Sequence, residues 1–122
     1  MISVLISAES RYPINRKRVR EATKKFIDKV GLDDVEVSVS IVGSRKIKKL
    51  NRDFRQIDKQ TNVLSFPLET SRDPDKMLRL GDVIICYPVA RGEAIREQKM
   101  MDEKIEELLI HGLKHLVGEH HE

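Results

Sequence analysis

The sequence predicts an α+β domain in which a small mixed four-stranded sheet packs with helices. Three observations predict this class. Four short, β-branched apolar stretches recur along the chain, and amphipathic helical stretches lie between some of them. The two kinds of stretch do not alternate strictly, as they would in a parallel βαβ fold. The length of 122 residues suits one core and not two, so we expect a single domain over 1–122.

The first third predicts a strand, a helix and a second strand. Residues 2–6 are apolar and β-branched, which is typical of a strand. Asn15 can cap a helix that reaches about Val30, and Gly31 favours the left-handed conformation that ends a helix. Residues 35–41 alternate apolar and polar side chains, which indicates a half-buried strand.

The middle third predicts a short helix, a short strand and a loop. Ser44 is expected to cap a helix through Phe54, with the Phe54 side chain turned inward. Residues 63–66 are expected to form a strand that Pro67 stops. The polar stretch 69–79 is expected to be a loop and the most mobile segment of the chain.

The last third predicts one more strand and two helices. Residues 80–86 form an apolar, β-branched stretch, and Pro88 suits the first turn of a helix over about 88–99. A final helix is expected over about 102–117, with Gly118 ending it. This last helix is the element expected to carry a metal site.

Composition excludes several classes of protein. The sole cysteine, Cys86, excludes an intramolecular disulfide framework and a cysteine-rich zinc site. No apolar run approaches the roughly 18 residues of a membrane-spanning helix. The first seven residues lack the basic segment and the length of a signal peptide. We therefore expect a soluble, cytoplasmic protein with no membrane partner.

Positive charge is concentrated in one part of the chain. The net charge is +3, yet residues 11–59 hold 15 lysines and arginines against 7 acidic residues. Such asymmetry favours a polyanionic partner, although a solvated helix surface is the plain alternative. The chain has no tryptophan, three phenylalanines and two tyrosines, so base-stacking platforms of the RRM or OB kind are not expected. Phosphate contacts should therefore dominate any binding of nucleic acid.

All four histidines lie in the last twelve residues. His111 and His115 are four apart on the predicted last helix, so both rings project from one face, one turn apart. If Gly118 ends that helix, His121 can fold back as a third ligand. Three imidazoles suit Zn²⁺ with an open fourth position, which is the layout of a catalytic site. The alternative interpretation is a surface histidine cluster at a frayed terminus.

The spacing H-x3-H-x2-G-x2-H is that of metzincin peptidases. In those enzymes a glutamate follows the first histidine and acts as general base, whereas Gly112 stands here. Without that carboxylate, a metal-bound water attacking a peptide has no proton acceptor on the helix. A metal-dependent peptidase or other hydrolase is therefore the least favoured hypothesis.

Three blocks together resemble one family. Residues 111–121 are similar to the motif H-G-x-L-H-L-x-G-Y-D-H. The segments LNRDFR at 50–55 and TNVLSFP at 61–67 are similar to L-N-x-x-[aromatic]-R followed by T-[DN]-V-L-S-F-P. LGDVIIC at 80–86 is similar to L-G-D-I-x-I-C. The chain thus resembles the bacterial YbeY-type endoribonucleases, also called ribosomal RNA maturation factors, while residues before 50 agree only in their strand–helix–strand pattern.

The resemblance implies an α+β fold around a small mixed sheet and one zinc ion per chain, held by His111, His115 and His121. It also implies a role in 16S rRNA 3′-end maturation and ribosome quality control. Arg55 falls on the family's functional arginine, which makes it the candidate catalytic residue that clamps the scissile phosphate. The expected partner is rRNA or the small ribosomal subunit, bound through the basic N-terminal half, and no DNA is expected.

The chain departs from the family motif in three places. Lys114 replaces a usual leucine, and Glu119 and His120 replace a usual tyrosine and aspartate. His120 and His121 are thus both available as third ligand, and the spacing favours His121. The leading hypothesis is a zinc-dependent endoribonuclease acting on single-stranded RNA. The alternative is a non-catalytic, zinc-stabilised assembly factor that binds rRNA or the ribosome.

Overall fold

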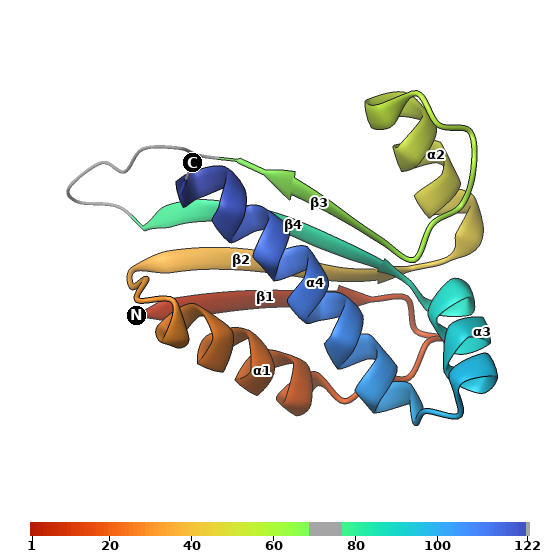
Figure 1. Cartoon of the computed structure of the whole chain (residues 1–122), viewed down its shortest axis with the longest axis horizontal. Coiled ribbons are helices and arrows are strands. Elements are labelled where there is room, and N and C mark those ends of the chain that lie inside the picture. Colours follow the sequence, from red (N-terminus) through yellow and green to blue (C-terminus); the bar gives the residue numbers. More distant parts are fainter. Residues whose placement is uncertain (69–76, 122) are drawn as a thin grey trace.

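The computed structural model describes residues 1–68 and 77–121, the side chains of 119–121 excepted. Four strands and four helices follow one another in a mixed order (Figure 1). Their bounds are β1 Ile2–Ala8, α1 Arg16–Lys29, β2 Val35–Val42, α2 Ser44–Arg55, β3 Val63–Pro67, β4 Leu78–Cys86, α3 Tyr87–Glu97 and α4 Met101–His121.

The strands form one mixed sheet in the order β1-β2-β4-β3. β1 pairs with β2, and β2 with β4, in parallel, whereas β3 pairs with β4 antiparallel along one edge. A parallel neighbour requires a crossover, and α1 supplies the one between β1 and β2. The predicted α+β class with a mixed four-stranded sheet is confirmed.

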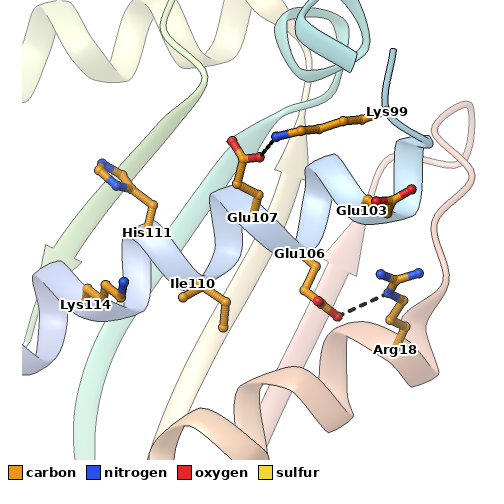
Figure 2. Close-up of a pocket in the computed structure, with 8 residues that line it drawn as sticks. All are labelled: Arg18, Lys99, Glu103, Glu106, Glu107, Ile110, His111 and Lys114. Atoms are coloured by element: carbon orange, nitrogen blue, oxygen red, sulfur yellow. Dashed lines mark hydrogen bonds and ion pairs between the residues drawn. The ribbon is translucent and has the colours of Figure 1, made fainter. Parts of the chain in front are cut away.

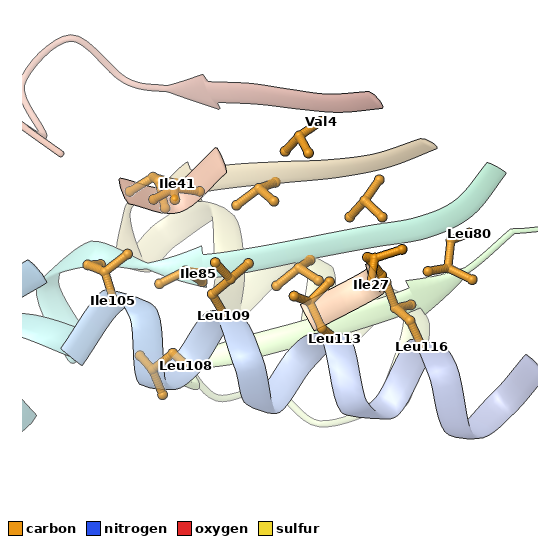
Figure 3. Close-up of a cluster of buried hydrophobic side chains, with 14 of the residues drawn as sticks. Val4, Ile27, Ile41, Leu80, Ile85, Ile105, Leu108, Leu109, Leu113 and Leu116 are labelled. Atoms are coloured by element: carbon orange, nitrogen blue, oxygen red, sulfur yellow. The ribbon is translucent and has the colours of Figure 1, made fainter. Parts of the chain in front are cut away.

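The main core lies between the sheet and the helices α1 and α4, which lie side by side over the same face (Figure 1). Leu109, Leu113 and Leu116 recur at helical spacing along α4 and are all fully buried. Figure 3 shows these leucines directed at the strands, where Val4, Ile41 and Ile85 meet them in the same cluster. This packing fixes the position of α4 and therefore of the histidines that it carries.

α2 packs against the sheet through a second apolar cluster. Ile47 of α2 is fully buried there with Leu64 of β3 and Cys86 of β4. Phe54 lies on the same stripe of α2, but its side chain is 64% exposed, so the prediction that it turns inward is wrong. The end of α2 reaches beyond the edge strand β3, and there Phe66 of β3 contacts the Phe54 ring but leaves most of it exposed (Figure 1).

The predicted helix ends are confirmed in part. The Asn15 side chain accepts a hydrogen bond from the Arg18 backbone amide and caps α1, and Gly31 follows that helix with φ +83°. Ser44 does not cap α2, because Gly43 occupies the cap position and Ser44 is already helical. Pro88 lies in the first turn of α3, as predicted.

Most predicted boundaries differ from the structure by one or two residues, Pro67 lies within β3 and does not stop it, and the largest differences concern β4 and α4. β4 begins at Leu78, so the end of the predicted loop 69–79 is strand, while residues 69–76 lie outside the described residues. The prediction that Gly118 ends the last helix is wrong, because α4 continues to His121. A glycine costs a helix interior only about 1 kcal/mol, and an ideal Cβ on Gly118 would meet nothing within 4 Å. Within the described residues, none of the helices is long and apolar enough to cross a membrane.

Candidate functional site

Polar side chains from three elements converge on a cavity of about 370 Å³ beside the edge strand β3. α4 contributes His111 and His115, α2 contributes Arg55, and β3 with the segment before it contributes the remainder. The full lining is Arg55, Thr61, Asn62, Val63, Leu64, Ser65, His111 and His115. The structure thus unites three of the four residues that the sequence singled out, although Arg55 and His111 lie far apart along the chain.

The two histidines form a close pair on α4. Their ring centroids are 5.0 Å apart and the ring planes meet at 67°. Both residues are exposed, so their ring nitrogens remain accessible from the cavity. This geometry follows from the four-residue spacing and confirms that both rings share one helix face.

Arg55 reaches the cavity because α2 ends there. Gln56 adopts a left-handed conformation with φ 58°, which ends the helix and turns the chain back. Asn51 is 2% exposed and donates a side-chain hydrogen bond of 3.0 Å to the Lys59 carbonyl, which holds the returning segment. Because the Asn51 side chain is buried and bonded to the returning backbone, it supports this turn.

Gly112 lets α4 approach the sheet closely. An ideal Cβ there would lie 2.7 Å from Val83 Cγ1 and 3.0 Å from Ser65 Oγ. The Ser65 hydroxyl donates a hydrogen bond of 3.0 Å to the Gly112 carbonyl, which ties β3 to α4 beside the histidines. A glutamate at this position would collide with Val83 and Ser65 already at its Cβ. The geometry therefore supports the sequence argument against a metzincin-type general base.

Sequence reasoning missed Asn62 and a buried lysine behind it. The Asn62 amide donates hydrogen bonds of 3.2 and 3.3 Å to the Glu93 carboxylate on α3. Glu93 in turn lies 3.4 Å from the ammonium of Lys104, whose side chain is 2% exposed. A lysine between apolar positions of an amphipathic helix is a sequence signal that could have indicated this network.

Lys104 connects α3 to α4 through three carboxylates. Its ammonium donates to Glu107 at 2.8 Å and to Glu97 at 3.0 Å, besides its contact with Glu93. Burial alone would lower the pKa of Lys104, but the hydrogen bonds that its ammonium donates to Glu107 and Glu97 outweigh burial and raise the pKa. The lysine therefore stays charged and anchors the helix that bears the histidine pair.

The third predicted ligand, His121, has its side chain outside the described residues. Among the side chains that the structure describes, no three histidines, cysteines or carboxylates are grouped so as to hold a metal ion. His111 and His115 supply two imidazoles that fit one ion by their chemistry. The structure therefore places two of the three predicted ligands side by side, while the metal and its third ligand stay predictions.

A second cavity, of about 410 Å³, opens on the outer side of α4 (Figure 2). In this cavity Glu106 pairs with Arg18 of α1 at 3.1 Å, and Glu107 pairs with Lys99. His111 lines this cavity as well and so adjoins both cavities. Because His115 and Arg55 line the first cavity and not this one, we assign function to the first cavity.

The fold and this cavity define a small α+β domain in which a histidine pair from one helix shares a cleft with an arginine from another. Comparison with known proteins identifies the family. The sequence profile described as endoribonuclease YbeY matches residues 5–122. The chain belongs to the endoribonuclease YbeY family, which confirms the resemblance.

Individual relatives agree with this assignment. A protein of Persephonella marina named endoribonuclease YbeY is 39% identical over 109 residues, covering 89% of this chain and 71% of the relative. The protein of the same name from Cellvibrio japonicus is 37% identical over 120 residues, covering 98% of this chain and 67% of the relative. The solution structure of TM1509 from Thermotoga maritima is similar with a TM-score of 0.63 and 28% identity, covering 93% of this chain and 71% of that one.

Proposed function

We propose that this chain is a zinc-dependent endoribonuclease that cleaves single-stranded RNA, acting in 16S rRNA 3′-end maturation and ribosome quality control. The observation that carries the proposal is the convergence of His111, His115 and Arg55 on one cavity. The names of the family relatives support ribonuclease chemistry. A metal held by a ligand pair and a nearby cation can together stabilise the charge that develops when a phosphodiester is cleaved.

His111 and His115 would hold the zinc ion, with His121 as third ligand. When bound, zinc would polarise a phosphoryl oxygen or activate water. In a continuous helix, His121 lies about 9 Å further along the axis than His115, so its use requires the last turn to unwind. Gly118 is the residue at which unwinding costs least, since glycine readily adopts left-handed conformations.

Arg55 would hold the scissile phosphate. A guanidinium stays charged at every physiological pH and can donate two parallel hydrogen bonds to phosphate oxygens. Its place at the cavity allows it to neutralise the negative charge that grows on those oxygens during cleavage. The Ser65 hydroxyl already donates a hydrogen bond to the Gly112 carbonyl, and the Asn62 amide donates one to Glu93. We therefore assign both side chains to the wall of the cavity.

Basic side chains would guide the RNA. Most cations of the N-terminal half lie on α1 and α2, and α2 alone carries six lysines and arginines against one aspartate. The same helix ends in Arg55, which lines the cavity, so the basic side chains of α2 lie on an element that borders the site. Affinity for RNA should therefore fall steeply as salt rises.

The first experiment pairs metal content with cleavage. Untagged wild type and His115→Ala are assayed for zinc by elemental analysis and then incubated with a labelled single-stranded fragment of the 16S rRNA 3′ end. One zinc per chain in the wild type, lost together with cleavage in the variant, is the expected result. Zinc loss without a change in cleavage would contradict a catalytic metal, and binding without any cleavage in the wild type would favour an RNA-binding assembly factor.

A second experiment isolates Arg55. Arg55→Ala should lower kcat about 10²–10³-fold, as the loss of one stabilising donor does elsewhere, and Arg55→Lys should restore part of it. Arg96→Ala is the matched control, because Arg96 also lies in the last turn of a helix but lines neither cavity. Equal kcat in both alanine variants would refute the role of Arg55.

A further inference from the structure

Phe54 is a large aromatic side chain held on the surface next to the candidate site. Its side chain is 64% exposed although it lies on the apolar stripe of α2. It directly precedes Arg55, which lines the cavity. A single exposed apolar side chain needs no explanation by itself, so the inference depends on what holds this ring and what surrounds it.

The ring of Phe54 is braced by the edge strand. Its centroid lies 5.3 Å from that of Phe66 on β3, with the planes tilted by 59°. Phe66 follows Leu64 and Ser65, two residues that line the cavity wall. The Phe54 ring is thus held in a defined orientation near the end of the cleft while most of its surface stays open to solvent.

The surroundings of this ring are strongly basic. The other cations of α2 are all exposed, and the helix carries one acidic residue, Asp53, which pairs with Arg52 at 3.3 Å. The exposed basic residues are Arg45, Lys46, Lys48, Lys49 and Arg52. An apolar ring on a helix of net positive charge complements a ligand that has both aromatic faces and negative charges, which describes a single-stranded nucleic acid.

We propose that Phe54 is a base-stacking platform that receives one unpaired nucleotide of the RNA, adjacent to the phosphate held at Arg55. This inference rests on the proposed function and adds a physical reason why the protein would prefer single-stranded RNA to duplex RNA. A base in a duplex has both faces covered, whereas an unpaired base can stack on an exposed ring. One braced phenylalanine suffices for this, and it differs from the base-stacking platforms of the RRM or OB kind that the composition does not favour.

The chain offers a direct spectroscopic test, because it contains no tryptophan. Phe54→Trp places a single indole at this position, and its emission is followed while short oligouridylate or oligoadenylate is added. Ile95→Trp is the matched control, because Ile95 is 68% exposed on α3 and lines neither cavity. We expect both oligonucleotides to quench F54W and to leave I95W unchanged, and inorganic polyphosphate, which has charge but no bases, to quench neither.

Binding by variants that remove the ring gives the second readout. Phe54→Ala should weaken the affinity for single-stranded RNA about 5- to 100-fold, and Phe54→Trp should retain it. Because the ring is mostly exposed, neither substitution removes a core contact, and Ile95→Ala should bind as the wild type does. The affinity for an RNA duplex of the same length should be unchanged in F54A.

The outcomes separate this inference from the proposed function. Wild type that neither binds nor cleaves RNA would overturn the proposed function itself. RNA that binds and is cleaved equally in wild type and F54A, with no quenching of F54W, would overturn the stacking platform and leave the ribonuclease proposal standing. Equal quenching of F54W by polyphosphate would also overturn the base-stacking proposal, because polyphosphate has no bases. A blue shift of F54W emission with protein concentration alone would overturn it as well, because it would assign Phe54 to contacts between copies of the chain.

Discussion

Two glycines of the same helix should respond in opposite ways to the same substitution. Gly112 and Gly118 both lie in α4, and changing either to alanine adds one methyl group and removes backbone freedom from the unfolded chain. In an open helical position this exchange stabilises a protein by up to about 1 kcal/mol. The difference between the two sites therefore measures what each new methyl group touches.

At Gly112 the new methyl group has no room. Its ideal Cβ lies 2.7 Å from Val83 Cγ1 and 3.2 Å from Val83 Cγ2, against about 3.5–4.0 Å for an ordinary carbon–carbon contact. Val83 is fully buried and β-branched, so it cannot turn aside. Overpacking of this kind costs about 1–3 kcal/mol, which outweighs the gain in helix propensity. At Gly118 nothing lies within 4 Å, so the gain remains.

Thermal and urea unfolding of the two alanine variants, each in the presence of a chelator, provide the assay. We expect Gly112→Ala to be less stable than Gly118→Ala by about 1–3 kcal/mol, or roughly 3–10 °C in the midpoint for a chain of this size. Equal stability of the two variants would refute the close approach of α4 to β4. A loss of stability in G118A would instead show that the chain leaves the helix at Gly118, as the sequence alone predicted.

Three further predictions concern the core and the buried lysine. Leu109→Ala should cost about 2–5 kcal/mol in urea unfolding because Leu109 is fully buried, and a loss below 1 kcal/mol would contradict its place in the core. Hydrogen bonds from Lys104 and then Lys99 lower the pKa of Glu97 and Glu107, so the stability they confer is present above pH 4.5 and is lost as the pH falls through the lowered values. Lys104→Met should lower the melting temperature at pH 7 and should make the loss of stability at acidic pH shallower. An unchanged dependence of the melting temperature on pH would contradict the contribution of the ion pairs around Lys104.

Local sequence patterns determined the elements of this fold well. Alternation of apolar residues in 35–41 and the β-branched stretch 80–86 both became central strands, because a strand that is buried on one face or both must show such a pattern. Asn15 and Pro88 marked helix starts, since capping and a fixed φ act within a few residues. The predicted spacing of His111 and His115 was equally local, and the pair lies on one helix face.

Errors arose where the outcome depended on distant neighbours. Phe54 lies on an apolar stripe but is exposed, because only the extent of the sheet decides how much of α2 is covered. Gly118 does not end α4, because a glycine permits a helix end and does not compel one. The carboxylates around Lys104 come from two helices, so their grouping depends on how α3 and α4 pack.

The sequence by itself determined the α+β class, the positions of the strands, the histidine pair and the family to which the chain belongs. Only the tertiary structure decided that Arg55 shares a cavity with those histidines and that Gly112 faces the sheet. It also decided that Asn62 donates a hydrogen bond to Glu93, which contacts the buried Lys104. The physical reason is the distance along the sequence over which each effect acts. Propensity, capping and periodicity depend on residues a few positions apart. A cavity is formed by side chains from distant segments, which meet only when β3 has paired with β4 in register and α4 has packed on the sheet.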